Sequence, residues 1–550
     1  MKTESDVISR LISPKNDKTG LLYLIISGVA IGFCVTFPTV IGLLLQWIAF
    51  VPASLAIYSM SEESPKRNVI KRFFSYWRTG FLFFMSEYLV IYHWFVSMYP
   101  LEFTGMSKGA AVVVVIFGWV GLSVLGSLGG AVIFALTVLF CGGRTALRHR
   151  IIRPFIIAFL YPLFEWLETN FWTGVPWNRL GLGQLCGNFT LTLLSSSLLG
   201  PYFTSFLIIL TSALTAYGLK YGKVRKYAGL ALCVFIGNII CGLCVMSMSS
   251  AGEQVSAAAV QGNFSSGEKW SASMDETFSA YKRLTESAAE NGAQIVIWPE
   301  TAMPVTVYDG IGYDRDFSRL SDSCDIYLIV GCFENRDGEM CNVLRCYDPD
   351  GAVLPDSYSK RHLVPFGEYI PERVLFEKLV PPLTEISILD RQLLEGKEVC
   401  NKVLGGHAAG FVICFDSIYE NLFRESVAEG ADFILMATND SWFGTSRALG
   451  MHVSQARLRS IENLTPVVRA ANTGISACID RLGRVVTSSA PDTETVIYAS
   501  METSGSGSLY SLTGNVFVFI CALVLSALTG AELGFSLGSR YRKRKSKSRN

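Results

Sequence analysis

Charged residues are scarce in this sequence of 550 residues. Asp, Glu, Lys and Arg make up only 17% of it, against about 25% in typical soluble proteins, while half of the residues are hydrophobic. The 47 basic and 46 acidic residues leave a formal net charge of +1. This balance excludes a strongly basic nucleic-acid-binding protein and an acidic disordered one. The composition therefore indicates a membrane protein without a nucleic-acid partner.

Histidine is also scarce, and the common phosphate-binding motifs are missing. The sequence contains no GxGxxG motif and no Walker loop, and no Gly-x-Ser-x-Gly elbow stands at a strand end. No repeat of 20–50 residues is visible. The histidines show no spacing typical of metal ligands, so we expect no metal site and no cofactor. They are His93, His149, His362, His407 and His452.

Cysteines are more frequent, with 14 in the chain. Cys241 and Cys244 form a C-x-x-C pattern, but they lie in an apolar run rather than a βαβ unit, which argues against a redox role. Seven cysteines lie within 251–503, and because seven is odd at least one thiol there is unpaired and a candidate for reactivity. These are Cys324, Cys332, Cys341, Cys346, Cys400, Cys414 and Cys478.

Eight apolar runs are long enough to cross a membrane, which takes about 20 mainly apolar residues. The first run is too long, and too closely followed by the second, to be a cleaved signal peptide. The predicted spans are residues 21–37, 39–60, 79–99, 109–140, 154–173, 190–217, 228–248 and 513–535.

Basic residues cluster in the loops on one side of these runs. They precede the first run and follow the second, fourth, sixth and eighth, whereas the other short loops hold only Lys108 and Arg179. Positive loops stay in the cytoplasm, so both termini are predicted to be cytoplasmic. The basic tail, which resembles a nucleic-acid patch in composition, directly follows a span, and anionic lipid is its expected contact. The clusters are Lys2, Arg10, Lys15 and Lys18; Lys66, Arg67, Lys71, Arg72 and Arg78; Arg144, Arg148, Arg150 and Arg153; and Lys220, Lys223, Arg225 and Lys226.

The segment between the seventh and eighth runs has the charge content of a soluble domain. The sequence therefore predicts a membrane domain of seven helices at 1–250, an extracytoplasmic domain at 251–503, and a last helix with a basic tail at 504–550. Within the middle part, short apolar strands alternate with helices, which indicates an α/β layered domain. Strands are predicted at 294–300, 325–333, 410–416 and 432–440, helices at 272–291 and 448–464, and a hairpin at 341–356.

Polar residues at strand ends and in one loop are the candidates for chemistry. Glu300 and Cys414 each close an apolar strand, and Lys360 lies in a loop. The carboxyl ends of strands are where open α/β sheets build sites. A glutamate, a lysine and a cysteine together supply a base, a cation for an oxyanion, and a nucleophile. Taken singly, each has an ordinary structural explanation: a capped turn, a solvated loop and a core thiol.

The context of these residues forms a known pattern. Trp298-Pro299-Glu300, then Lys360 with Glu368, then Cys414 resembles the nitrilase, or carbon–nitrogen hydrolase, superfamily with its Glu-Lys-Cys triad. Over nearly the whole chain the flanking motifs are similar to one family within it, the apolipoprotein N-acyltransferases. The matching motifs are 260–263, Trp270, 298–304, 362–368, 439–444, 455–457 with Arg459, 472–475, His93-Trp94, Glu165 and 174–177.

This resemblance implies a fold, a reaction and a location. The fold would be a polytopic α-helical membrane protein of about eight spans, with an extracytoplasmic α/β nitrilase-like α-β-β-α sandwich. The reaction would be ping-pong acyl transfer from a phospholipid, through a Cys414 thioester, to the α-amino group of the N-terminal S-diacylglyceryl-cysteine of an apolipoprotein. The location would be the bacterial cytoplasmic (inner) membrane, with the catalytic domain on the periplasmic side.

The resemblance also assigns roles to individual residues. Glu300 would be the base, Lys360 the oxyanion partner and Cys414 the nucleophile. Glu368 would orient Lys360 and the acceptor amine, and Trp270 would pack near the acyl or headgroup entrance.

Two neighbours of the predicted nucleophile depart from the family pattern. The family usually has Tyr-Glu after the cysteine, whereas this sequence has Phe415 and Asp416. Phe415 lacks a hydroxyl, and Asp416 keeps the charge on a shorter arm. As supporting or substrate-binding residues, they predict altered tuning or substrate preference and the same reaction.

Both implied substrates carry acyl chains, so the site should open to the bilayer. The apolar, proline-broken stretch 375–383 is predicted to be a mobile lid that dips into the outer leaflet, with ordinary core as the alternative. Glu165 lies in a span, where a charge is costly, and is therefore a functional candidate. Its alternative is an interfacial position beside Trp166 and Trp172.

Two other functions remain open. A membrane-tethered nitrilase-type amidase or hydrolase would use the same triad with water as the acyl acceptor. The apolar stretch and the seven preceding spans favour the transferase, because a small soluble amide needs no access to lipid. The other alternative is a transporter or scaffold whose nitrilase-like domain only binds, and the intact Glu300, Lys360 and Cys414 argue against it.

Overall fold

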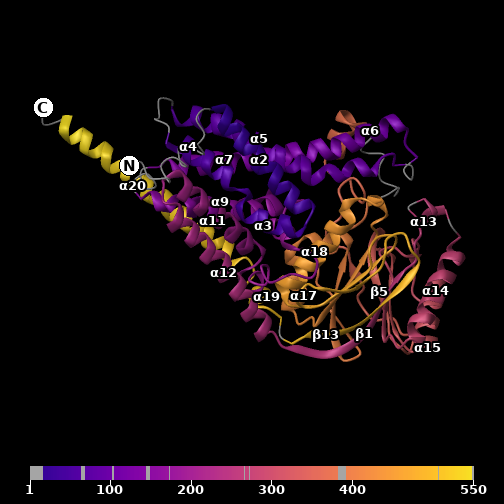
Figure 1. Ribbon diagram of the computed structural model, residues 1–550. Helices are drawn as coiled ribbons and strands as arrows, with labels where there is room; N and C mark the ends of the chain where they lie inside the picture. The colour runs from indigo at the N-terminus through magenta and orange to yellow at the C-terminus, as the bar shows by residue number, and fades with distance from the viewer. Residues whose placement is uncertain are drawn as a thin grey trace. The chain divides into compact units, whose positions relative to one another are not determined.

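The computed structural model describes residues 17–62, 68–101, 105–143, 149–172, 174–265, 267–271, 273–381, 392–505 and 507–547 (Figure 1). The chain divides into two compact units. The first comprises Met1–Tyr92, Val120–Cys244 and Asn515–Asn550, and the second comprises His93–Trp119 and Val245–Gly514. Part of the charge pattern used for orientation lies outside the described residues, namely Lys2, Arg10, Lys15, Lys66, Arg67, Arg144 and Arg148.

Six helices in the described residues are long and apolar enough to cross a membrane. They are Lys18–Thr36, Val40–Glu62, Val69–Met98, Lys108–Cys141, Pro201–Lys220 and Val224–Met248. In the element labels they are formed by α2 (Asp17–Thr36), α3 (Val40–Ala49), α4 (Val51–Glu62), α5 (Val69–Ile91), η1 (Tyr92–Met98), α6 (Lys108–Ile116), η3 (Phe117–Gly121), α7 (Leu122–Cys141), α11 (Pro201–Lys220) and α12 (Val224–Met248). These helices confirm the prediction of a polytopic helical membrane protein.

The two remaining predicted spans correspond to shorter apolar helices. The run at 154–173 forms α9 (Arg153–Leu167), which has 15 residues and continues into the π-turn η5 (Glu168–Trp172). The last run lies in α20 (Val516–Lys547), whose apolar part is Val516–Glu532.

One predicted span begins later than expected. The run at 190–217 becomes a helix only at Pro201, after the 3-10 turn η6 (Leu180–Gln184) and the short α10 (Ser196–Leu199). Gly200 has a φ of +84°, which ends the preceding turn, and proline is favoured in the first turn of a helix. Apolar composition alone did not reveal this break.

Three glutamates are buried inside the first unit: Glu87, Glu165 and Glu168. Glu165 accepts a hydrogen bond from the backbone N–H of Leu180 at 3.3 Å. Glu165 is 1% exposed, whereas Trp172 is 51% exposed. Glu165 is therefore buried within the protein, and both its functional role and the interfacial alternative stay predictions.

The second unit contains two β-sheets. The first has the order β13 (Thr495–Ser504), β1 (Ala251–Gln261), β2 (Ile295–Ile297), β4 (Tyr327–Arg336), β5 (Glu339–Tyr347) and β6 (Tyr358–Ser359), with β3 (Thr306–Val307) paired to β4. The second has the order β12 (Val485–Ser488), β11 (Ala477–Ile479), β10 (Val467–Ala471), β9 (Phe433–Thr438), β8 (His407–Ile413) and β7 (Lys402–Leu404).

The inner faces of the two sheets share one hydrophobic core. In β1, Ala257 and Ala259 point into this core, while Ala258 and Val260 belong to the cluster on the outer face of the sheet, as the period-2 alternation of a strand requires. The inner core joins residues of the first sheet, such as Ile297 and Leu344, to residues of the second, such as Phe411 and Leu435.

Helices cover both outer faces, which completes the predicted α-β-β-α sandwich. Figure 1 shows α14 (Met274–Glu290) and α15 (Tyr313–Cys324) on one side of the strands and α17 (Glu420–Ala428) and α18 (Arg447–Asn463) on the other. Tyr281 and Phe317 pack on the first sheet, and Phe423 and Ala456 pack on the second. The short helices of this unit are α13 (Glu268–Ser271), α16 (Arg373–Leu379), η8 (Cys414–Ile418), η9 (Ser441–Phe443) and α19 (Leu509–Thr513).

Candidate active site

Glu300 stands on a tight turn that follows β2. The next residue, Thr301, has a φ of +43°, a conformation that β-branched residues rarely adopt. The turn passes directly over β4, because a Cβ on Gly331 would lie 2.1 Å from the carbonyl oxygen of Pro299. Glycine at 331 therefore lets the turn approach the sheet, and Glu300 is held there at 5% exposure.

Lys360 lies immediately after β6 and is held between two glutamates. Its Nζ is 2.8 Å from Oε1 of Glu300 and 2.8 Å from Oε2 of Glu368. Asn342 on β5 donates from Nδ2 to the same two carboxylates, at 2.9 Å and 3.1 Å. The structure thus brings together Glu300, Lys360 and Glu368, and it adds Asn342, which the sequence did not single out.

The pKa values of the two carboxyl groups diverge. Burial raises the pKa of Glu300, but the charge and hydrogen bond of Lys360, together with Lys269, outweigh it and leave the pKa below its ordinary value. Burial is also the largest influence on Glu368, where Lys360 opposes it and Glu300 reinforces it, so that this pKa is raised. Glu300 is therefore the more readily ionised of the two carboxyl groups, and it is the one available as a carboxylate to accept a proton. The two glutamates also raise the pKa of Lys360 against the effect of burial, which keeps this lysine charged.

Cys414 follows β8 at a sharp turn with a φ of +47°. Its carbonyl oxygen accepts a hydrogen bond from the Ser417 hydroxyl at 2.7 Å and lies 3.2 Å from Nε2 of His452. Burial and the charge of Glu300 raise the pKa of the thiol, while Lys360 lowers it. The thiol thus stays protonated until a base removes its proton, and it lies within electrostatic reach of both groups.

A buried network lies behind Cys414. Asp440 accepts hydrogen bonds from Arg469 at 2.7 Å and from Thr438 at 2.9 Å, and it lies 2.8 Å from Nδ1 of His452. Ligand-type atoms of Cys414, Asp440 and His452 lie within 4.8 Å of one another, a grouping that the sequence spacing did not reveal. Because both oxygens of Asp440 are already engaged, this arrangement supports the turn at Cys414 by hydrogen bonding.

Asp416 faces the chain around Lys360. Its carboxylate accepts hydrogen bonds from the Tyr358 hydroxyl at 2.8 Å and from the backbone N–H groups of His362 and Ile413 at 2.7 Å and 3.2 Å. Asp416 is fully buried, and burial raises its pKa to about 6. Phe415, its neighbour, packs its ring edge-on against Tyr419 at 5.6 Å. Asp416 is therefore placed to brace the loop that carries Lys360.

Lys269 was not anticipated from the sequence. It is 3% exposed on α13, and its Nζ donates to the carbonyl oxygen of Glu300 at 3.0 Å. The adjacent Trp270 was expected near the substrate entrance, but its side chain lies outside the described residues. The sequence did not indicate that Lys269 would be buried, because it is a basic residue in a polar segment.

The predicted lid divides into a packed face and an exposed face. Phe376 on α16 packs edge-on against Phe366 at 4.9 Å and against Phe117 at 6.2 Å. Leu375 and Leu379 are 51% and 67% exposed. Residues 382 and 383 of the predicted lid lie outside the described residues. The exposed side chains form an apolar surface of the kind that contacts lipid or a ligand.

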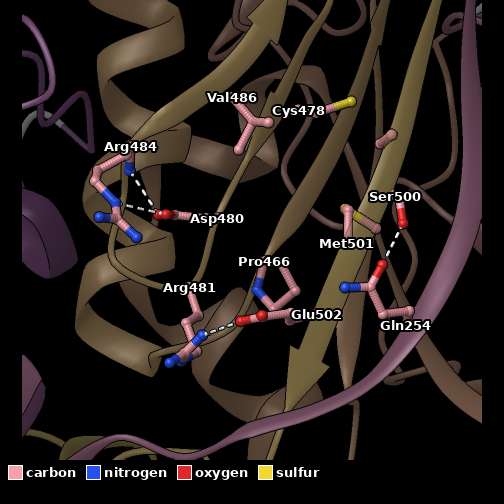
Figure 2. A pocket seen from close by; sticks show the side chains of 11 residues that line it. Gln254, Pro466, Cys478, Asp480, Arg481, Arg484, Val486, Ser500, Met501 and Glu502 are labelled. Carbon is pink, nitrogen blue, oxygen red and sulfur yellow. Dashed lines mark hydrogen bonds and ion pairs between the residues drawn. The ribbon is translucent and has the colours of Figure 1, made fainter. Parts of the chain in front are cut away.

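A pocket of about 240 Å³ lies elsewhere in this unit, among β11, β12 and β13 (Figure 2). Two ion pairs line it, Arg481 with Glu502 at 2.7 Å and Arg484 with Asp480 at 2.6 Å. Glu300, Lys360 and Cys414 are not among its lining residues, so this pocket is separate from the candidate active site.

The sandwich with its glutamate, lysine and cysteine, on a chain with several apolar helices, defines a multi-pass membrane protein of the carbon–nitrogen hydrolase class. The family model described as "Carbon-nitrogen hydrolase" matches residues 256–509. The model described as "Apolipoprotein N-acyltransferase N-terminal domain" matches residues 29–214. With the relatives described next, these matches show that the chain belongs to the apolipoprotein N-acyltransferase family, whose members are acyltransferases.

Similar proteins carry the name of this family. The apolipoprotein N-acyltransferase of Geobacter metallireducens is 29% identical over 533 residues, covering 94% of this chain and 95% of that protein. The apolipoprotein N-acyltransferase of Allorhizobium ampelinum is 30% identical over 397 residues, covering 69% of this chain and 73% of that protein. A solved carbon–nitrogen hydrolase from Helicobacter pylori G27 is 17% identical with a TM-score of 0.35, covering 46% of this chain and 90% of that one.

Proposed function

We propose that this protein moves a fatty acyl chain from a phospholipid to the α-amino group of the N-terminal S-diacylglyceryl-cysteine of lipoproteins. The observation that carries the proposal is the charged Lys360 held between Glu300 and Glu368, within electrostatic reach of the Cys414 thiol. The names of the relatives support a lipoprotein acceptor, and the apolar helices support a lipid environment.

In the first half-reaction, Glu300 accepts the proton of the Cys414 thiol. The thiolate attacks the sn-1 ester carbonyl of the phospholipid, and Lys360 stabilises the negative charge on the carbonyl oxygen. When the tetrahedral intermediate collapses, the C–O bond breaks and the glyceryl oxygen takes the proton from Glu300. The products are a lysophospholipid and a thioester on Cys414.

In the second half-reaction, the α-amino group of the acceptor attacks the thioester carbonyl. Glu300 accepts a proton from the amine, Lys360 again stabilises the oxyanion, and the C–S bond breaks. The departing thiolate recovers the proton, so that the enzyme returns to its initial state and the product is an amide.

Glu368 has a supporting role in this proposal. Its carboxylate contacts Lys360 and accepts a hydrogen bond from the N–H of Val364 at 2.8 Å, which fixes its position. Through this contact, Glu368 orients Lys360 and the acceptor amine. The pKa of Glu368 is raised while that of Glu300 is lowered, so Glu300 is the carboxylate that acts as the base.

We assign residues 1–250 to a membrane domain, 251–503 to the catalytic domain, and 504–550 to a last helix with a basic tail. The asymmetry of basic loops supports cytoplasmic termini and a catalytic domain on the outer, periplasmic side of the bacterial inner membrane. Diacylglyceryl acceptors and phospholipid donors both reside in a bilayer, which the exposed Leu375 and Leu379 are suited to contact.

The proposal predicts a covalent acyl adduct. The purified full-length protein, incubated with a phospholipid labelled in its sn-1 chain, is expected to gain the mass of one acyl chain. The adduct should lie on the peptide containing Cys414 and should be removed by neutral hydroxylamine, which cleaves thioesters. The measurement is intact and peptide mass spectrometry.

A phospholipid labelled only in its sn-2 chain is the control for this experiment. Labelling of another residue, or no adduct with any phospholipid tested, would contradict the proposal.

A further inference from the structure

A second buried lysine contacts the turn that carries Glu300. The Nζ of Lys269 donates to the Glu300 carbonyl oxygen at 3.0 Å and to the Thr301 hydroxyl at 2.5 Å. Before Lys269, Ser265 and Glu268 close the turn at the start of α13 with two hydrogen bonds, from Ser265 N to Glu268 Oε2 at 3.1 Å and from Glu268 N to Ser265 Oγ at 3.3 Å. The two hydrogen bonds of Lys269 therefore connect α13 to the Glu300 turn.

The contact falls where the backbone is strained. Thr301 is a β-branched residue with positive φ, a conformation that persists only when the surroundings enforce it. Gly331 lies beneath the turn, and Lys269 binds one atom on each side of the peptide bond between Glu300 and Thr301. A shift in this bridge would move the Glu300 carboxylate away from Lys360 and the thiol.

Lys269 also contributes positive charge to the site. It is a cation beside Glu300 in addition to Lys360, and it lowers the pKa of Glu300. The pKa of Lys269 itself is lowered to about 8, because burial, with a smaller contribution from Lys360, outweighs the opposing effects of Glu300 and Cys414. The Glu300 carboxylate is thus stabilised by the charges of Lys360 and Lys269 and by hydrogen bonds from Asn342 and from the N–H of Asn439, which donates at 2.9 Å.

We propose that Lys269 is a positioning residue for the base: it holds the Glu300 turn and keeps Glu300 in its carboxylate form. This role rests on the proposed function of Glu300 as the proton acceptor of Cys414. Lys269 does not touch the substrate in this account. It acts through Glu300, and its loss impairs the step in which the thiol loses its proton.

The test is the pH dependence of Cys414 alkylation by iodoacetamide in the full-length protein, followed on the Cys414 peptide by mass spectrometry. In Lys269→Met, the pH at which the rate rises should move upward by about one unit, because a neighbouring positive charge is lost. At pH 6 the rate of acyl-adduct formation should fall by about 100-fold, as expected for a displaced catalytic group. The phospholipid concentration for half-maximal rate should stay unchanged.

Three further variants separate the parts of this role. Lys269→Gln retains a hydrogen-bond donor without the charge and should show the same shift in pH with a smaller fall in rate. Lys269→Arg retains the charge and should keep the wild-type pH dependence. Glu268→Ala weakens the turn of α13 but leaves Lys269 in place, and should leave the pH dependence unchanged.

An unchanged pH dependence in both Lys269→Met and Lys269→Gln would overturn the proposal, as would the same shift in Glu268→Ala. Alkylation needs no phospholipid. If no phospholipid acylates the wild-type protein but the shift is present, the proposed acyl donor fails and the role of Lys269 holds.

Discussion

Cys414→Ala is expected to abolish the acyl adduct and all N-acylation, while the protein keeps its fold. In the proposed reaction both half-reactions pass through the sulfur of Cys414, so the thioester intermediate cannot form at this site without it. The change removes one atom from a half-buried side chain, so its expected cost in stability is small. Intact mass with labelled phospholipid and thermal unfolding in the same detergent measure the two effects.

Cys400→Ala is the matched control, because Cys400 is also a half-buried cysteine of the α/β unit. It should retain the adduct in full. If Cys414→Ala still forms a hydroxylamine-sensitive adduct, Cys414 is not the nucleophile. If Cys414→Ala loses both the adduct and the fold, Cys414→Ser provides the test, since serine is similar in size to cysteine and should be acylated far more slowly.

Lys360→Met is expected to lower the rate of adduct formation by about 1000-fold or more. Removing an oxyanion donor costs about 100- to 1000-fold by itself. The change also leaves Glu300 and Glu368 buried beside each other without Lys360, which is the largest influence that lowers the pKa of Glu300. The pKa of Glu300 would then rise, so a smaller fraction of it would be available as a carboxylate to act as the base. Single-turnover rates from quenched samples measure the fall.

The same change should destabilise the fold by about 3–5 kcal/mol, the usual cost of breaking a buried ion pair. Lys282→Met is the control, because Lys282 is 49% exposed on α14 and forms a surface ion pair with Glu286 at 3.8 Å. If Lys360→Met lowers the rate of adduct formation and the free energy of unfolding no more than Lys282→Met does, the assignment of Lys360 to the site is contradicted. Lys360→Arg should not restore the rate, since a planar guanidinium does not fit the space of a compact ammonium.

Much of the fold could be predicted from the sequence because its signals are local. Apolar length predicted the membrane helices, and short apolar strands alternating with helices predicted an α/β layered domain. The two-sheet sandwich followed from the family resemblance. The late start of α11 was missed because Gly200 and Pro201 interrupt an apolar run without changing its mean hydropathy. The predicted span at 154–173 corresponds to α9, which passes into a π-turn after 15 residues.

The candidate site was predicted where residues stand at strand ends. Glu300 and Cys414 follow β2 and β8, so their positions could be predicted from the strand pattern. Lys360 was singled out as a loop lysine, and the family resemblance added Glu368. Asn342 and Lys269 were missed because their roles arise from tertiary contacts: one lies within a strand and the other on a short polar turn.

The substitution of Asp416 for the glutamate usual in the family is explained by its contacts. It was predicted as a supporting or substrate-binding residue. Its carboxylate accepts hydrogen bonds from Tyr358 and from the backbone at His362, so it supports the loop that carries Lys360. A shorter acidic side chain is sufficient for this bracing role, which is consistent with a working site.

The fate of the thioester tests the central claim most directly. Acyl-enzyme carrying a labelled chain is divided between a diacylglyceryl-cysteine peptide with a free α-amino group, the same peptide N-acetylated, and buffer. We predict that the label leaves rapidly only with the free amine and appears in the peptide as an amide. Release of free fatty acid at one rate in all three samples would contradict the account and identify water as the acyl acceptor.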